Sequence, residues 1–200
     1  MRMPCVRQIG QKDWSHENPV KTALIGGIGN VLLGDDGVGP YVVRLLEALY
    51  SFGENVEIAD LGTPALDLMH RISGVDTVIL VDSVASADET GTVQLYRKSD
   101  IVEETPSQRL DPHSPALSEC LMAAELLGCG PKNVLLVGIV GKSYEPGQDL
   151  SETVQQSVGT AIEAILGELA LRGFDFEKRV IAQKPEIWWC DTQYERVAGS

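Results

Sequence analysis

A glycine-rich segment directly after a short apolar run is the feature that most constrains how this chain can fold. Residues 22–26 (TALIG) form the apolar run, and residues 26–40 continue it as GGIGNVLLGDDGVGP. A short apolar run that ends in glycine predicts a buried strand, and the apolar residues from Val42 to Leu49 recur at helical spacing. The segment therefore predicts a strand, a tight loop and a helix in succession.

Further strands and helices alternate along the rest of the chain. The other predicted strands are residues 56–59, 77–81, 92–96 and 133–140, and the other predicted helices are residues 64–72, capped by Thr63, then 114–127 and 151–172. This alternation predicts an α/β fold, a three-layer α/β/α sandwich with a mostly parallel five-stranded sheet. Residues 92–96 alternate polar and apolar side chains, so we expect them to form an antiparallel edge strand.

The 200 residues are predicted to form one domain with a segment on either side. The domain spans residues 22–172, preceded by an irregular leader over residues 1–21 and followed by a mixed-charge tail over residues 173–200. The tail contains Trp188-Trp189, which could pack over the core or contact a partner. Deleting the tail would then lower either the melting temperature or partner binding.

The charge balance excludes several classes of partner. The chain carries 16 Lys and Arg against 29 Asp and Glu, a net charge of −13. Such a chain cannot neutralise phosphates, so neither nucleic acid nor an anionic membrane surface is an expected partner, whereas a cation is permitted. No apolar run approaches the ~18 residues of a membrane span, and no signal-peptide core is present. The four cysteines form no CxxC pair. We therefore expect reduced thiols and a cytoplasmic protein.

Nucleotide binding is the usual meaning of a glycine-rich loop after a first strand, but this loop lacks the required residues. Counted from Gly27, the sixth position of a dinucleotide fingerprint is Leu32, and no Gly-Lys-Ser/Thr of a P-loop occurs. Asp35 and Asp36 stand where a pyrophosphate would bind and would repel it. No nucleotide cofactor is therefore expected.

Three aspartates lie at or just beyond the predicted carboxyl ends of strands, where α/β sheets form their functional crevice: Asp36, Asp60 and Asp82. His113, between Pro112 and Pro115, is the best placed of the three histidines. Carboxylates with one imidazole suit a divalent ion such as nickel, zinc or manganese. Two alternatives stay open: the Asp35-Asp36 pair could simply cap a helix, and Asp82 could be a buried structural carboxylate, so Asp82 is left out of the predicted set.

Conventional hydrolase signatures are absent. The sequence contains neither GxSxG nor HExxH, and the cysteine nearest to His113, Cys120, falls inside a predicted helix. Paired carboxylates that activate water, as in aspartic proteases, remain possible.

Residues 27–39 (GIGNVLLGDDGVG) resemble, without a gap, the signature of the [NiFe]-hydrogenase maturation endopeptidases. The resemblance covers about residues 22–170. Further matching segments follow in the family's order: Asp60-Leu61-Gly62-Thr63, Val81-Asp82-Ser83, Pro112-His113, Gly138-Ile139 and GQDLS at residues 147–151.

The resemblance implies a peptidase that removes a C-terminal extension from the hydrogenase large-subunit precursor once nickel has been inserted. It implies Asp36, Asp60 and His113 as metal ligands, with nickel supplied by the precursor rather than stored as a cofactor. Asp36 or Asp60 would act as general base, or water on the metal would attack. The alternative is a nickel-binding assembly factor that docks on the precursor without cutting it.

Overall fold

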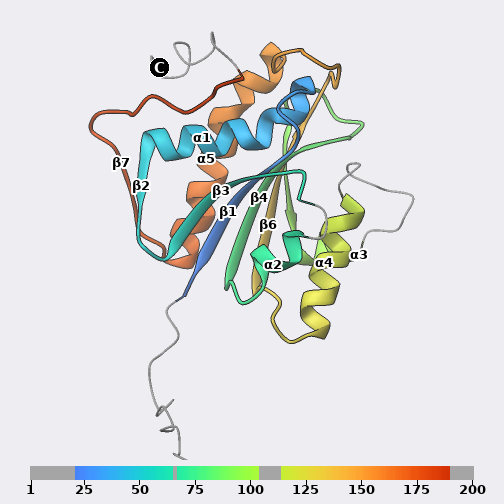
Figure 1. The fold of residues 1–200 in the computed structure, drawn as a ribbon, viewed down its shortest axis with the longest axis vertical. Coiled ribbons are helices and arrows are strands. Elements are labelled where there is room, and N and C mark those ends of the chain that lie inside the picture. Colours follow the sequence, from blue (N-terminus) through green and yellow to red (C-terminus); the bar gives the residue numbers. More distant parts are fainter. Residues whose placement is uncertain (1–20, 65–66, 104–113, 190–200) are drawn as a thin grey trace, which may run out of the picture.

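The computed structural model describes residues 21–64, 67–103 and 114–189 (Figure 1). Five strands form one sheet in the order β3-β1-β4-β6-β5, all parallel except β5 at one edge. Their bounds are β1 Ala23–Ile28, β3 Val56–Gly62, β4 Thr77–Val84, β5 Val93–Arg97 and β6 Asn133–Val140. The mostly parallel sheet and its antiparallel edge confirm the fold class predicted from the sequence.

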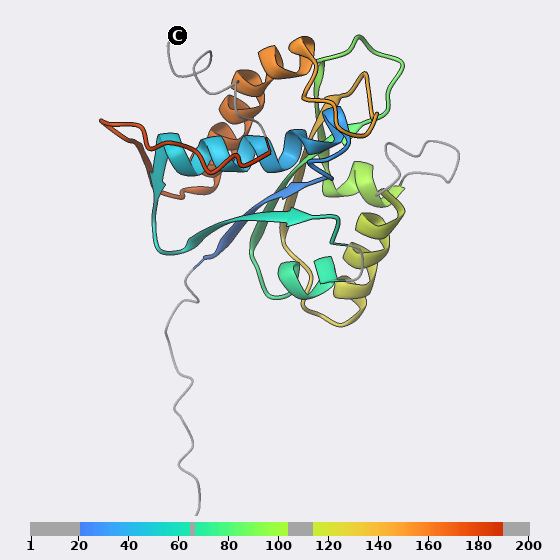
Figure 2. The ribbon, with the colours of Figure 1, turned by 45° about the horizontal axis from the view of Figure 1, so that its top comes forward.

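Helices cover both faces of this sheet (Figures 1 and 2). One face carries α1 (Val38–Leu49) and α5 (Glu152–Arg172), and the other carries α2 (Asp67–Ile72), α3 (Lys98–Glu103) and α4 (Ser114–Leu126). No helix in the described ranges combines the length and hydropathy needed to cross a membrane.

The alternation of side chains along each strand divides the apolar interior into two cores. On β4, Ile79 and Val81 pack with α1 and α5, whereas Val78 and Leu80 pack with α2 and α4. Since successive side chains of a strand point to opposite faces, the next residue, Asp82, shares the face of Leu80. This parity decides which helices a carboxylate at the end of a strand meets.

The loop after β1 closes tightly on itself because glycine stands at its contact points. Gly29 adopts φ 130°, and a Cβ there would lie 1.8 Å from the carbonyl oxygen of Asp36. A Cβ on Gly39 would lie 2.2 Å from the carbonyl oxygen of Ile28. No side chain fits at either distance, so these glycines let the loop fold against α1 and β1. A short 3₁₀ turn, η1 (Gly34–Gly37), leads into α1.

The observed elements differ from the predicted ones mainly where a turn intervenes. β3 and β4 run three residues beyond their predicted ends, to Gly62 and Val84. Helix α2 is described from Asp67, whose N–H donates to the Pro64 carbonyl (2.9 Å), and residues 65–66 of the predicted helix lie outside the described residues. Helix α3 was not predicted, and its Asp100 carboxylate caps its start by accepting the Arg97 N–H (2.7 Å).

A second, two-stranded sheet was not predicted. β2 (Tyr50–Phe52) pairs antiparallel with β7 (Phe176–Lys178), which lies within the predicted tail. Residues 176–189, hereafter the strap, continue across α1 (Figure 2). Two backbone hydrogen bonds hold them there, from Arg179 N to Leu49 O (2.8 Å) and from Gln183 N to Ala48 O (2.9 Å). This part of the tail therefore packs on the domain.

Candidate active site

The candidate site lies at the carboxyl edge of the sheet, where the glycine-rich loop leaves β1. The 3₁₀ turn η1, which carries Asp35 and Asp36, contacts the start of α1 and also β4, the neighbour of β1. Loops at this edge line the functional crevice of an open α/β sheet. The two loop carboxylates therefore lie where the fold places its chemistry.

Asp35 is a structural carboxylate. It is fully buried and accepts four hydrogen bonds from the loop that connects β6 to α5. Its Oδ2 accepts from Lys142 N (2.7 Å), Ser143 N (3.1 Å) and Ser151 Oγ (2.9 Å), and its Oδ1 accepts from Ser151 N (2.6 Å). Hydrogen bonds to a charged acceptor are roughly twice as strong as neutral ones, so Asp35 fixes the glycine-rich loop to the start of α5.

Asp36 is held from its own loop instead. Its side chain is 5% exposed, and Oδ2 accepts a hydrogen bond from Asn30 N at 2.7 Å. Oδ1 of Asn30 accepts the Leu32 N–H (3.0 Å), so this side chain stabilises the same loop. The adjacent carboxylates thus differ, because Asp35 links distant segments whereas Asp36 is oriented within the loop.

Asp60 lies on the α1 side of the sheet. It occupies β3 opposite Gly27 of β1, two residues after Ile58, which packs in the α1–α5 core. Its Oδ1 accepts the Gly62 N–H (3.0 Å), and its Oδ2 lies 3.7 Å from Nη2 of Arg44 on α1. Its side chain is 23% exposed. The carboxylate thus turns the end of β3 and faces an arginine.

Asp82 lies on the opposite face. Its side chain is 4% exposed, and Oδ1 accepts the N–H of Ser83 at 2.8 Å. Leu80, two residues earlier, packs in the core that Leu117 and Leu121 of α4 complete. Asp82 therefore lies on the strand that η1 contacts and on the face of α4, whereas Asp60 lies on the strand whose Gly62 carbonyl accepts the Gly29 N–H of the same loop (2.8 Å).

His113 lies outside the described residues, so its predicted role as a ligand stays a prediction. The helix that follows it in sequence is described from Ser114 onward. Just beyond the other end of α4, the carbonyl of Cys129 accepts the Gly74 N–H (2.8 Å) near the amino end of β4. The 13 residues of α4 span about 20 Å, so the first turn of α4 lies toward the carboxyl edge, on the face of Asp82 (Figure 1).

A three-donor metal site is not completed by the described residues alone. Within residues 21–64, 67–103 and 114–189, no three His, Cys, Asp or Glu side chains lie close enough to hold one ion. The ligand set of Asp36, Asp60 and His113 therefore stays a prediction, because His113 lies outside the described residues. Because Asp36 and Asp82 are carboxylates near one strand end, they supply oxygen donors to which an imidazole could be added.

Cys120 is not a catalytic nucleophile in this arrangement. It is buried in α4, and this burial raises the pKa of its thiol above the ordinary value. A thiol that stays protonated at neutral pH is a poor nucleophile, since the thiolate is the reactive form. This agrees with the sequence, which contained no pattern for a cysteine peptidase.

The sequence analysis left Asp82 outside the predicted set because it could also be a buried structural carboxylate. Asp82 directly follows the most continuous apolar strand, TVILV, at residues 77–81. Its strand position alone placed it at the crevice. What the sequence could not supply was the face, because this depends on which helices cover each side of the sheet.

Comparison with known proteins agrees with this architecture. A family model described as hydrogenase maturation protease matches residues 40–168. The hydrogenase 2 maturation protease of Escherichia coli K12 is 33% identical over 156 residues, covering 76% of this chain and 93% of that protein. A putative hydrogenase maturation protease of Methanocaldococcus jannaschii is 36% identical, covering 74% of this chain and 97% of that protein. The solved structure of the E. coli hydrogenase maturating endopeptidase HybD aligns with a TM-score of 0.72 at 29% identity, over 79% of this chain and 98% of that one.

Proposed function

Because the chain belongs to the hydrogenase maturation protease family, we propose that it removes the C-terminal extension of a [NiFe]-hydrogenase large-subunit precursor after nickel insertion. Its relatives are named proteases and endopeptidases, so the chain is a peptidase and its expected partner is a hydrogenase precursor. The free thiols of Cys120 and Cys129 suit the reducing cytoplasm that we propose as its compartment.

The observation that carries this proposal is the division of labour between Asp35 and Asp36. Asp35 is occupied by four hydrogen bonds that join the loop to distant segments, whereas the Asn30 N–H of its own loop orients Asp36 beside β4. A carboxylate positioned at the carboxyl edge, in a loop whose glycines permit close approach, suits general-base chemistry on a bound peptide.

In the proposed reaction, which is of the aspartyl type, the carboxylate of Asp36 takes a proton from water as the water oxygen attacks the carbonyl carbon of the scissile peptide. The C–N bond then breaks, and the departing amine receives a proton. The products are the shortened precursor and a free peptide, so neither an oxidant nor a nucleotide is required.

We propose that nickel enters with the precursor as part of the substrate. An acidic site with few protein donors can complete the coordination of an ion that the cysteines of the precursor already hold. A peptidase that recognised the metal would thereby spare precursors not yet loaded. The sequence predicts Asp36, Asp60 and His113 as the contacting residues. Asp60 faces Arg44 of α1, and the end of its strand also meets the glycine-rich loop, because the Gly29 N–H donates to the Gly62 carbonyl (2.8 Å).

The test is cleavage of the partner precursor, prepared with and without nickel and followed by intact-protein mass spectrometry. We expect only the nickel-loaded form to lose a C-terminal peptide. Binding of the loaded precursor without any cleavage would instead support the assembly-factor alternative. Equal cleavage of both forms would retain the peptidase but contradict recognition through nickel.

A further inference from the structure

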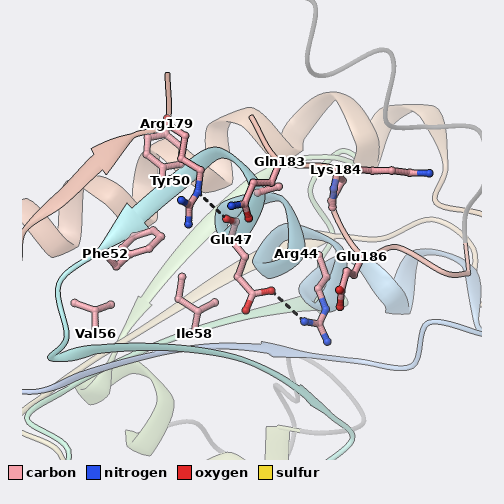
Figure 3. Close-up of a pocket in the computed structure, with 12 residues that line it drawn as sticks. Arg44, Glu47, Tyr50, Phe52, Val56, Ile58, Arg179, Gln183, Lys184 and Glu186 are labelled. Atoms are coloured by element: carbon pink, nitrogen blue, oxygen red, sulfur yellow. Dashed lines mark hydrogen bonds and ion pairs between the residues drawn. The ribbon is translucent and has the colours of Figure 1, made fainter. Parts of the chain in front are cut away.

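A groove of about 450 Å³ lies between α1, the edge strand β3 and the strap (Figure 3). This volume falls within the roughly 300–1,000 Å³ of ordinary ligand sites. Val56 and Ile58 of β3 form one wall, and Arg179 and Lys184 of the strap lie on the opposite side (Figure 3). The groove is therefore apolar along the strand and cationic along the strap.

The charge of this groove is opposite to that of the protein as a whole. Its lining includes Arg44, Arg179 and Lys184 against Glu47 and Glu186, whereas the chain carries a net charge of −13. A local excess of positive charge on an acidic protein favours an anionic ligand and orients its approach.

Two of these cations are available to a ligand. Arg44 already pairs with Glu47 (3.0 Å) and approaches Asp60 (3.7 Å). In contrast, within the described part of the chain, neither Arg179 nor Lys184 forms an ion pair with a carboxylate. Arg179 uses only Nε, which donates to the backbone oxygen of Glu47 at 3.3 Å.

The wall opposite these cations suits an extended chain. β3 is the terminal strand of its sheet, so along its outer edge no described strand pairs with it. Unpaired strand edges accept extended peptides, whose alternate side chains enter neighbouring pockets. Apolar side chains of such a peptide would meet Val56 and Ile58, while acidic ones would reach the strap.

We propose that the groove binds an extended, acidic peptide segment of the precursor that flanks the bond to be cleaved. The proposal rests on the proposed function and adds the substrate's binding surface and its chemistry. Arg44 connects the groove to Asp60 at the end of β3, so a segment bound here leads toward the carboxyl edge of the sheet. The family match ends at residue 168, so the strap and its two cations, Arg179 and Lys184, lie outside the matched region.

The test measures fluorescence anisotropy of the full chain with a labelled peptide of about six residues, the length of an ordinary strand, alternating valine with glutamate. We expect the double substitution Arg179→Gln with Lys184→Gln to weaken binding about threefold to tenfold. Lys178→Gln is the matched control, because Lys178 is exposed on the same strap but does not line the groove; we expect no change. Lys184→Gln alone, at an exposed position, guards against misfolding of the double variant and should weaken binding by a smaller factor.

The peptide with glutamine in place of glutamate should bind more weakly than the acidic peptide, and added salt should remove the difference. Equal binding of both peptides, an equal effect of Lys178→Gln, or no binding of the acidic peptide would overturn the groove proposal. The proposed function is tested separately by precursor cleavage. If the precursor is cleaved with a KM that the double substitution leaves unchanged, the groove proposal is refuted and the peptidase proposal stands. If the groove residues affect peptide binding but the precursor is not cleaved, the peptidase proposal is refuted instead.

Discussion

The two faces of the sheet use carboxylates differently at the same edge. On the face of α1 and α5, Asp60 closes a turn through Gly62 and faces Arg44. On the face of α2 and α4, Asp82 stands beside the strand contact of the glycine-rich loop and under the helix that follows His113. Position at the end of a parallel strand therefore does not by itself decide the surroundings of a carboxylate, because the face of the sheet determines which groups it meets.

The largest expected effect is the loss of activity at Asp36. Asp36→Asn removes the proposed general base and should slow precursor cleavage about 10²- to 10⁴-fold. Asp36→Glu retains a carboxylate and should keep a measurable fraction of the rate. Mass spectrometry of a cleavage time course measures both. Asp175→Asn, which changes an exposed aspartate beside the turn that precedes β3, at the opposite edge of the sheet, is the control. An Asp36→Asn variant with full activity would remove Asp36 from the site.

The next largest effect is a loss of stability at Asp35, which distinguishes this residue from the adjacent Asp36. Asp35→Asn places an amide NH₂ against backbone N–H donors in a fully buried position, so the free energy of unfolding should fall by about 2–4 kcal/mol. Urea denaturation measures this. Asp36→Asn should destabilise the protein less than Asp35→Asn does, because the Asn30 N–H that donates to Asp36 belongs to the same loop, whereas the donors to Asp35 belong to distant segments. Equal destabilisation by Asp35→Asn and Asp36→Asn would contradict the assignment of Asp35 as the structural carboxylate of the pair.

A third prediction concerns Glu168, a buried structural carboxylate on α5. Burial opposes its ionisation, but hydrogen-bonded ion pairs with Arg97 (2.7 Å) and Arg172 (2.8 Å) outweigh it and lower the pKa of this carboxyl. The unfolded chain therefore binds the proton first as the pH falls, and the stability that Glu168 contributes at neutral pH is lost below about pH 4.5.

Glu168→Gln should accordingly lower the free energy of unfolding by about 1 kcal/mol at neutral pH. The difference from the parent protein should shrink as the pH falls below about 4.5. Urea denaturation across this range measures it, and Glu163→Gln, at an exposed position of the same helix, should show no such trend. A difference that grows toward acid pH would contradict the lowered pKa.

The smallest effect on stability is expected at Asp60. Its contact with Arg44 is 3.7 Å long and partly exposed, so Asp60→Asn should cost less than about 1 kcal/mol of stability. Arg44→Gln should have a similar effect, and the double variant should show little coupling between the two in a double-mutant cycle. A coupling well above 1 kcal/mol would show that this face depends on the pair more strongly than its geometry indicates.

Most of the sheet was predictable because its strands are short apolar runs that end at glycine or aspartate. The helix over residues 38–49 and the antiparallel edge strand were also correctly predicted, because each has a local spacing of polar and apolar residues. The pairing of β2 with β7 was not, because it joins segments about 125 residues apart through only three residue pairs. No local pattern in either segment predicts such a contact.

The candidate site was predictable in its residue types but not in its arrangement. The sequence identified Asp36 in the loop and Asp60 and Asp82 at strand ends, but it could not assign Asp60 and Asp82 to opposite faces of the sheet. Assignment to a face requires the positions of α1 and α4, which depend on tertiary packing. The role of Asp35 likewise required the contact with Ser151, more than a hundred residues away in sequence.

The most direct test compares Asp82→Asn with Asp60→Asn in one cleavage time course on the nickel-loaded precursor. Both substitutions remove one carboxylate charge at the end of a strand, so they differ chiefly in the face that they change. The account predicts that Asp60→Asn, which removes a predicted metal ligand, slows release of the C-terminal peptide at least about 100-fold, while Asp82→Asn, outside the predicted set, stays within about threefold of the parent protein. The reverse order, with Asp82 essential and Asp60 dispensable, would contradict the predicted ligand set.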